Sequence, residues 1–227
     1  MKCYFFFKRL FDIVTSTIAL VILSPLFLVI AIAIKLDSKG PVIFKQERMG
    51  YQGKPYNMYK FRSMVQDAQS MGSGLYSFKD DPRVTKVGKV LRHTSLDELP
   101  QLANVLKGDM AYVGPRSPVV SGFPKYEDLS DTYKRRFSVL PGITGLAQVV
   151  GRNEFSWDEK VEYDNIYIDK IKKWGLLYDI KILFMTVVRV GSMSDVEESP
   201  ENMEKNKDLM NMGHEQLDSS QNKVNVD

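Results

Sequence analysis

The stretch IVTSTIALVILSPLFLVIAIAI, residues 13–34, decides where this protein works. A straight helix needs roughly 20 apolar residues to span a bilayer, and this stretch supplies them. Pro25 lies inside it, removes a backbone donor and predicts a kink. We expect the preceding Ser24 to help satisfy the carbonyls that the kink frees. The Ser24-Pro25 pair therefore predicts a break in a membrane helix.

Basic residues flank the apolar stretch on both sides. Lys2, Lys8 and Arg9 precede it, and Lys35 and Lys39 follow it. Basic residues prefer the cytoplasmic side, and both flanks are basic. The charges therefore do not show that either end of the stretch lies outside the cell. We interpret the stretch as a re-entrant hairpin that dips into the cytoplasmic leaflet, with an ordinary kinked span as the alternative. A cleaved signal peptide is not expected, because the run is too long and no A-x-A site follows.

Composition indicates one moderate domain beside this anchor. The chain has 227 residues, of which 44% are apolar, and its single cysteine, Cys3, gives no sign of an oxidising compartment. Residues 1–196 carry 28 basic and 20 acidic side chains, whereas residues 197–227 carry 8 acidic side chains and 3 lysines. A basic body suits an anionic membrane or a phosphate-bearing substrate, and a solvated basic face explains the charge equally well. No nucleic-acid-reading module is recognisable.

The chain divides into three parts with a mixed α/β, mostly helical fold. We expect a membrane anchor over residues 1–38, a cytoplasmic domain over residues 39–194 and a polar, disordered tail over residues 195–227. The expected regular segments of the domain follow in chain order. They are a strand and turn at 41–54, a strand at 56–64, helices at 84–91 and 127–137, a loop at 140–145, and helices at 157–171 and 176–190. The last helix is either interfacial on the membrane or buried in the core.

Adjacent carboxylates at Asp97 and Glu98 are the best catalytic candidates. Ser95 and Glu98 have the spacing of a capping box, which predicts a helix start with Asp97 in its first turn. A helix N-terminus and the nearby Arg92 would keep the carboxylates ionised and attract phosphate. An ionised Asp can attack phosphorus or ligate a hard cation. On the spacing alone, a capping box with a solvated Asp is the commoner explanation.

Several cations lie in segments that also contain Gly or Pro, where side chain and backbone together can hold pyrophosphate. These candidate substrate-binding residues are Lys60, Arg62, Arg92, Arg116 and Arg152. Taken singly, each is explained as a surface charge. The region of residues 154–164, ending at Asp164, is a further candidate for a sugar or nucleobase pocket. No zinc pattern, Walker loop, GxGxxG fingerprint or Ser/His/Asp order is present, which excludes those classes of enzyme.

An ordered set of motifs resembles the small monotopic phosphoglycosyl transferases, the bacterial sugar transferases. The motifs are KFRSM at 60–64, DPRVT at 81–85, SLDELPQL at 95–102, NVLKGD at 104–109, VGPR at 113–116 and PGITG at 141–145. The resemblance covers nearly all of residues 5–190 and favours the re-entrant topology at Ser24-Pro25. The chain departs from it at Ser117, where the family's Pro-Arg-Pro motif has its second proline.

The resemblance implies a Mg²⁺-dependent enzyme on the cytoplasmic face of the inner membrane. It implies transfer of a sugar 1-phosphate from a UDP-sugar to polyprenyl (undecaprenyl) phosphate, with release of UMP. Asp97 matches the nucleophile that forms a phosphosugar-aspartyl intermediate and is the expected metal-binding residue, and Glu98 completes the dyad. Lys60 and Arg92 match positions near the phosphates. The product would initiate assembly of an exopolysaccharide, a capsule or a glycoprotein.

Other functions stay open on the residues alone. A noncatalytic membrane-tethered partner of a glycan assembly complex would use Asp97 and Glu98 only as a helix cap. A membrane-bound phosphohydrolase would use water in place of the lipid phosphate. Neither the sugar nor the pathway follows from the sequence, and the apolar anchor is the only hint of a homo-oligomer.

Overall fold

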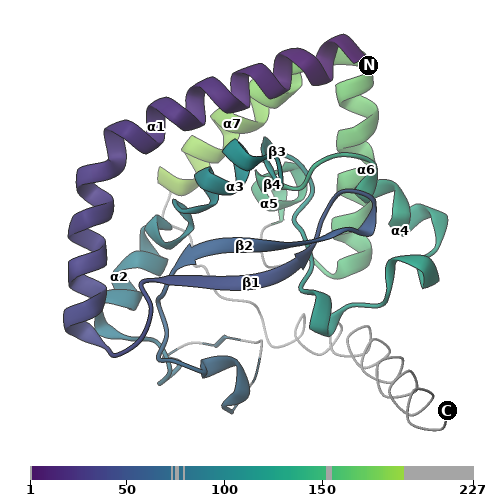
Figure 1. Ribbon diagram of the computed structural model, residues 1–227. Helices are drawn as coiled ribbons and strands as arrows, with labels where there is room; N and C mark the ends of the chain where they lie inside the picture. Colours follow the sequence, from purple (N-terminus) through teal and green to yellow (C-terminus); the bar gives the residue numbers. More distant parts are fainter. Residues whose placement is uncertain (1, 73, 75–76, 79, 152–154, 192–227) are drawn as a thin grey trace, which may run out of the picture.

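The computed structural model describes residues 2–72, 74, 77–78, 80–151 and 155–191. These residues form a mixed α/β fold that is mostly helical, as the sequence predicted (Figure 1). The helices are α1 (Lys2–Asp37), α2 (Lys86–His93), α3 (Gln101–Lys107), α4 (Asp131–Arg135), α5 (Leu146–Val150), α6 (Trp157–Trp174) and α7 (Leu176–Gly191). The strands are β1 (Ile43–Met49), β2 (Pro55–Phe61), β3 (Ala111–Val113) and β4 (Gly142–Thr144).

Two small sheets organise the body of the fold, residues 39–191. β1 and β2 form an antiparallel hairpin in which Phe44 faces Lys60 and Arg48 faces Tyr56. Because opposite residues in a sheet point to the same face, Lys60, Arg48 and Tyr56 share one side of the hairpin. β3 and β4 are parallel, so the segment at 140–145, which we predicted to be a loop, contains a short strand.

Helix α1 is continuous through Pro25 but bends about halfway along its length (Figure 1). A proline at position 25 cannot donate to the carbonyl of Val21, four residues earlier. The Ser24 hydroxyl donates to that same carbonyl at 2.8 Å. The predicted role of Ser24 is therefore confirmed: its side chain satisfies the carbonyl that the proline leaves free, which matters most where no water is present.

Both halves of α1 pack on the same body. Near the N-terminus, the Lys8 ammonium forms a 2.8 Å ion pair with Asp179 of α7. Near the C-terminus, Ile30 and Ile34 are buried in one hydrophobic cluster with Phe61 of β2. Figure 1 shows the helix passing along the top and then down the left side of the other elements. The bend therefore lets one helix cover two sides of the body.

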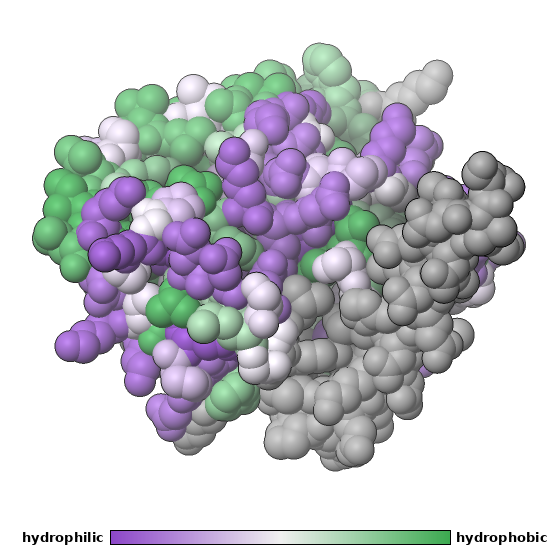
Figure 2. Space-filling view, turned by 60° about the horizontal axis from the view of Figure 1, so that its bottom comes forward, coloured by the Kyte–Doolittle hydropathy of each residue, from purple (hydrophilic) through white to green (hydrophobic). Residues whose placement is uncertain are grey.

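The outward face of α1 is a large apolar surface. Among the described residues, the segment Cys3–Asp37 is the one helix long and apolar enough to cross a membrane. Figure 2 shows apolar surface along the left and top margin of the molecule, where α1 lies, around a polar centre. Helix α7 buries Ile182 in the core but exposes its other face. Its exposed large side chains are Leu177, Ile180, Phe184, Val187 and Val188.

Two local predictions are wrong. Ser95 adopts a left-handed conformation with φ 56° and makes no capping hydrogen bond, and Leu96–Glu98 form a short 3₁₀ turn instead of an α-helix start. The capping box occurs instead at the start of α6, between Ser156 and Glu159. The polar helix predicted at 127–137 is shorter, because α4 begins only after its cap at Ser130. The predicted tail at 195–227 lies outside the described residues.

Candidate active site

A cavity of about 980 Å³ opens beside the β1–β2 hairpin. Its wall combines one face of the hairpin, the 3₁₀ turn that carries Asp97 and Glu98, and the segment that follows β3. Basic side chains outnumber acidic ones in this wall. The lysines and arginines are Arg48, Lys60, Arg62, Arg83, Arg92, Arg116, Lys160 and Arg189, whereas the acidic residues are Asp67, Asp97 and Glu98. Such a cavity is suited to an anionic ligand.

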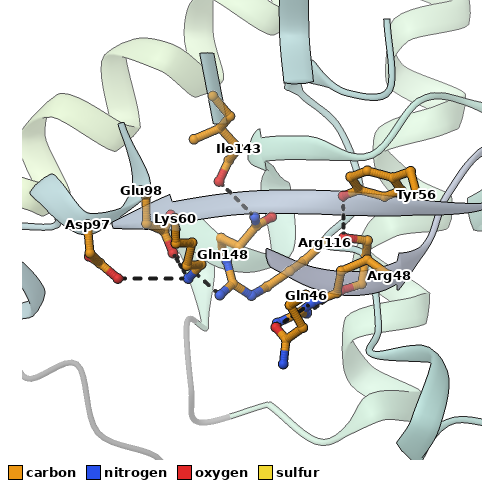
Figure 3. Close-up of polar contacts among 10 residues, drawn as sticks. Gln46, Arg48, Tyr56, Lys60, Asp97, Glu98, Arg116, Ile143 and Gln148 are labelled. Atoms are coloured by element: carbon orange, nitrogen blue, oxygen red, sulfur yellow. Dashed lines mark hydrogen bonds and ion pairs between the residues drawn. The ribbon is translucent and has the colours of Figure 1, made fainter. Parts of the chain in front are cut away.

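Lys60 joins the two candidate carboxylates. Its ammonium donates to Glu98 Oε1 at 2.7 Å and lies 4.0 Å from Asp97 Oδ2 (Figure 3). Arg116 approaches the same Glu98 oxygen at 3.6 Å from the other side. Glu98 is therefore held between two cations. Asp97 lies at the edge of this cluster, lines the cavity and has no closer ion-pair partner among the described residues.

The pKa values of the two carboxyls move in opposite directions. Burial raises the pKa of Asp97 above its usual value, against the attraction of Lys60. Burial alone would also raise the pKa of Glu98, but the positive charges of Lys60 and Arg116 outweigh it and lower that pKa to about 2. Glu98 is thus a permanent anion that anchors the cations. Asp97 is the more basic carboxylate and hence the better nucleophile of the two.

The segment Gly114–Pro118 presents Arg116 to the cavity. Arg136 donates to the Arg116 carbonyl at 2.7 Å, and Arg48 donates to the Ser117 carbonyl at 2.6 Å. The Arg116 side chain itself is 43% exposed, which leaves its guanidinium accessible to a ligand. A buried arginine, Arg136, and a half-buried one, Arg48, therefore fix the backbone that carries an exposed arginine.

Residues 65–70, Gly74 and Ser77 form another part of the cavity wall. Arg83 forms a 2.6 Å ion pair with the buried Asp81, and its Nη1 also donates to the carbonyls of Ala68, Met71 and Gly74. One guanidinium thus gathers three backbone acceptors of the loop. Gly74 and Ala68 line the cavity, so Arg83 shapes its rim.

Two of the sequence-predicted binding residues have different surroundings from those expected. Arg62 lines the cavity, but its guanidinium donates to the carbonyls of Ser38 and Lys39 at 2.7 Å, where it caps the C-terminal end of α1. Asp164 does not line the cavity and is 1% exposed, in a 2.8 Å ion pair with Arg136. Arg152 lies outside the described residues. Asp97, Glu98, Lys60, Arg92 and Arg116 do meet around the cavity.

Sequence reasoning missed several residues of the wall. Arg48 lines the cavity on the same face of the hairpin as Lys60, and the alternation of a β-strand would have found it once the register was known. Trp157 and Lys160 of α6 also line the cavity, with the Lys160 ammonium 5.3 Å from the centre of the Trp157 ring. No local sequence signal places the start of α6 beside Asp97.

Asp97 is suited to hold a divalent cation together with a ligand. No group of three or more His, Cys, Asp or Glu side chains that could hold a metal occurs in the part of the chain that the structure describes. Mg²⁺ is commonly bound through one or two carboxylates plus substrate phosphates, without a full protein cage. Glu98 is already engaged by Lys60, whereas Asp97 faces the cavity. The donor set therefore fits Mg²⁺ bound jointly by Asp97 and a phosphorylated substrate.

Comparison with known proteins identifies relatives along most of the chain. The sequence model described as bacterial sugar transferase matches residues 3–193. The UDP-glucose:undecaprenyl-phosphate glucose-1-phosphate transferase of Klebsiella pneumoniae is 50% identical over 188 residues, 81% of this chain and 40% of that protein. The undecaprenyl-phosphate galactose phosphotransferase of Salmonella typhimurium is 44% identical over 195 residues, 80% of this chain and 40% of that protein.

A shorter relative matches over nearly its whole length. The exopolysaccharide production protein PSS of Rhizobium leguminosarum bv. phaseoli is 43% identical over 189 residues, 80% of this chain and 93% of that protein. The chain thus spans about two fifths of the length of the two named transferases. The matched part contains the long N-terminal helix and the whole cavity described above.

Proposed function

Because this chain belongs to the bacterial sugar transferase family, we propose that it transfers a sugar 1-phosphate from a UDP-sugar to undecaprenyl phosphate. The products are undecaprenyl-diphosphate-sugar and UMP. The names of the Klebsiella and Salmonella relatives support the reaction and the lipid acceptor. The observation that carries the proposal is the pair Asp97 and Glu98 in a basic cavity beside an apolar helix.

Asp97 acts as the nucleophile in this reaction. A carboxylate oxygen of Asp97 attacks the phosphorus bonded to the sugar, and the bond from that phosphorus to the bridging oxygen breaks, so that UMP leaves with the electron pair. An oxygen of the lipid phosphate then attacks the same phosphorus and releases the Asp97 carboxylate. The raised pKa of Asp97 supports this role, because a more basic carboxylate is the stronger nucleophile.

The cations around Asp97 offset the repulsion between its carboxylate and a diphosphate. Lys60 lies 4.0 Å from Asp97 Oδ2, and Arg116 and Arg92 line the same cavity. Glu98 keeps Lys60 and Arg116 in place. Fixed charges aimed at a reacting phosphoryl group are worth several kcal/mol in such sites, roughly 3 kcal/mol for each good donor. Electrostatic positioning is therefore the main contribution of these side chains.

Mg²⁺ is the cofactor that we propose for this site, with Asp97 as its protein ligand. When bound, the ion would neutralise the diphosphate and polarise its oxygens. The support is the donor set: one carboxylate facing a cavity large enough for a nucleotide-sugar, with the second carboxylate held by lysine.

We further propose that α1 is re-entrant and that the body lies on the cytoplasmic face. Both halves of α1 pack on the same body, through Lys8–Asp179 at one end and Ile34 at the other. A helix that crossed the bilayer would carry one of these ends away from the body. The exposed apolar faces of α1 and α7 would then lie in one leaflet, with α7 at the interface. Such an anchor keeps Asp97 near the depth of a lipid phosphate.

We infer that the product initiates an exopolysaccharide or a capsule, since the Rhizobium relative is named for exopolysaccharide production. The two transferases named above differ in their sugar, glucose in one and galactose in the other. A hexose 1-phosphate is thus the class of group that we expect to be transferred.

The test is UMP release by the purified chain in lipid nanodiscs. The assay contains UDP-glucose, UDP-galactose or a UDP-N-acetyl sugar, with and without undecaprenyl phosphate and with Mg²⁺ or EDTA. We expect release from one preferred donor that requires both the lipid phosphate and Mg²⁺. Release without the lipid would identify a phosphohydrolase instead. No release from any donor by folded protein would indicate a noncatalytic partner or another nucleotide carrier.

A further inference from the structure

The segment that carries Arg116 has an unusual density of hydrogen bonds from other parts of the chain. Each of its five residues exchanges a backbone hydrogen bond with a group outside the segment. The bonds are Gly114 N to Thr144 O at 2.9 Å, Gly142 N to Pro115 O at 3.0 Å, Arg136 Nη2 to Arg116 O at 2.7 Å, Arg48 Nη1 to Ser117 O at 2.6 Å and Met49 N to Pro118 O at 3.0 Å. The backbone on both sides of Arg116 is therefore fixed.

One side-chain bond completes this arrangement. The Tyr56 hydroxyl and the Ser117 hydroxyl are hydrogen-bonded at 2.8 Å, and Ser117 is only 4% exposed. Serine, unlike proline, has no ring that fixes its own φ angle. At position 117 the conformation therefore depends on partners, and Tyr56 and Arg48 supply them from neighbouring positions of the hairpin.

The position of Tyr56 on β2 links the Arg116 segment to the strand that also holds Glu98. Tyr56 and Lys60 lie on the same face of β2, so one strand holds Glu98 through Lys60 and the Arg116 segment through Tyr56. Arg116 approaches Glu98 at 3.6 Å, a distance that a small shift of the segment would lengthen. Coulomb attraction falls with distance, so the cation would also move relative to a bound phosphate.

We propose that Tyr56 is a positioning residue, which acts through its hydrogen bond to Ser117 to set the place of the Arg116 guanidinium for the phosphate groups of the substrate. This inference rests on the proposed function for the identity of the substrate. The position of the Arg116 guanidinium does not depend on the proposed function, because an exposed guanidinium in a basic cavity binds a diphosphate whatever the later chemistry.

The test compares variants that remove or keep the hydroxyl pair in the full chain in nanodiscs. Tyr56→Phe and Ser117→Ala each lower kcat/KM for sugar-phosphate transfer about tenfold, and the double variant is no worse than either single one, because both break the same bond. Ser117→Thr retains the hydroxyl and most of the activity. In an Arg116→Lys background, Tyr56→Phe lowers kcat/KM less than twofold, since the lysine has lost the geometry that Tyr56 sets.

A second measurement is independent of turnover. The Kd for inorganic pyrophosphate, measured by isothermal titration calorimetry, rises about fivefold in Tyr56→Phe and Ser117→Ala and stays unchanged in Ser117→Thr. Tyr59→Phe is the matched control: Tyr59 lies on β2 but its hydroxyl accepts from Lys107 at 3.3 Å, away from the Arg116 segment. Tyr59→Phe changes neither kcat/KM nor the Kd for pyrophosphate.

Two results would overturn this inference without touching the proposed function. The first is a Tyr56→Phe variant whose kcat/KM and Kd for pyrophosphate both stay within twofold of wild type. The second is a Tyr56→Phe variant that loses as much kcat/KM in the Arg116→Lys background as in wild type. If the wild-type chain transfers nothing while pyrophosphate affinity responds as expected, the proposed function fails and the positioning role stands. The melting temperature of Tyr56→Phe should stay within about 3 °C of wild type, because a single partly buried hydrogen bond contributes little to the stability of a domain of this size.

Discussion

Replacing Arg62 separates a structural role from a binding role. Its guanidinium makes hydrogen bonds of 2.7 Å to the carbonyls of Ser38 and Lys39, of 3.0 Å to the Ser38 hydroxyl and of 3.3 Å to the Ile34 carbonyl. Arg62 is 5% exposed, so water does not take over these acceptors when the charge is removed. Each of the two short charge-assisted bonds contributes about 1.5 kcal/mol. Arg62→Met should therefore lower the free energy of unfolding by about 3 kcal/mol.

A loss of that size is measurable as a shift in melting temperature. For a domain of this length it corresponds to roughly 6–12 °C. The assay is thermal unfolding in nanodiscs, followed by tryptophan fluorescence, together with the KM for the UDP-sugar below the new melting temperature. We expect a large fall in melting temperature and a KM within twofold of wild type, because the guanidinium is engaged by the end of α1.

Arg92→Met is the matched control. Arg92 lines the same cavity and acts on Asp97 only through its charge. Its replacement should raise KM several-fold with little change in melting temperature. An Arg62→Met variant with an unchanged melting temperature and a raised KM would refute the capping argument and return Arg62 to the substrate site.

Three further predictions concern the site and the core. Asp97→Asn should lower UMP release at least about a thousandfold while the protein still sediments with membranes; substantial turnover would contradict the nucleophile assignment. Lys60→Met should lower kcat/KM about a hundredfold, since it removes the cation nearest both carboxylates, whereas Lys45→Met on the outer face of the hairpin should not change it. Burial, which outweighs the attraction of its arginine partner, raises the pKa of Asp164 from 3.8 to about 6. Between these values the folded state binds one proton more than the unfolded state, so this group's contribution to stability falls as pH rises, by about 3 kcal/mol across the window. Urea unfolding between pH 4 and 7 should therefore show a pH slope in wild type that is weaker in Asp164→Asn, and equal slopes would contradict the raised pKa.

The elements that the sequence predicted well are those set by local pattern. The long helices follow from apolar runs and 3.6-residue spacing, and the interruption at Ser24-Pro25 follows from the chemistry of proline. The turn at Leu96–Glu98 was misjudged because the capping-box spacing takes no account of the left-handed backbone at Ser95. The strand β4 was missed because three residues carry too little alternation to be recognised without their partner β3.

Within the site, sequence spacing identified the residues that bear charge but not what each charge contacts. Arg62 follows Lys60 by two residues, yet only the three-dimensional fold brings the end of α1 to its guanidinium. Asp164 is different, because a sequence signal was present: it lies between Val161 and Ile168 in a stripe of buried residues at helical spacing. A carboxylate in such a stripe indicates a buried ion pair, which here is completed by Arg136.

The packing of α1 has a consequence for anyone who wants a soluble form of the enzyme. Ile30 and Ile34 belong to the same buried cluster as Phe61, and Lys8 neutralises Asp179 inside the body. Deleting the helix would uncover that cluster, leave a buried carboxylate without its cation and remove the helix end that Arg62 caps. The anchor is therefore a part of the catalytic core that cannot be trimmed off. Solubilisation has to proceed by redesigning the outward-facing side chains of α1 while its inward face is left intact.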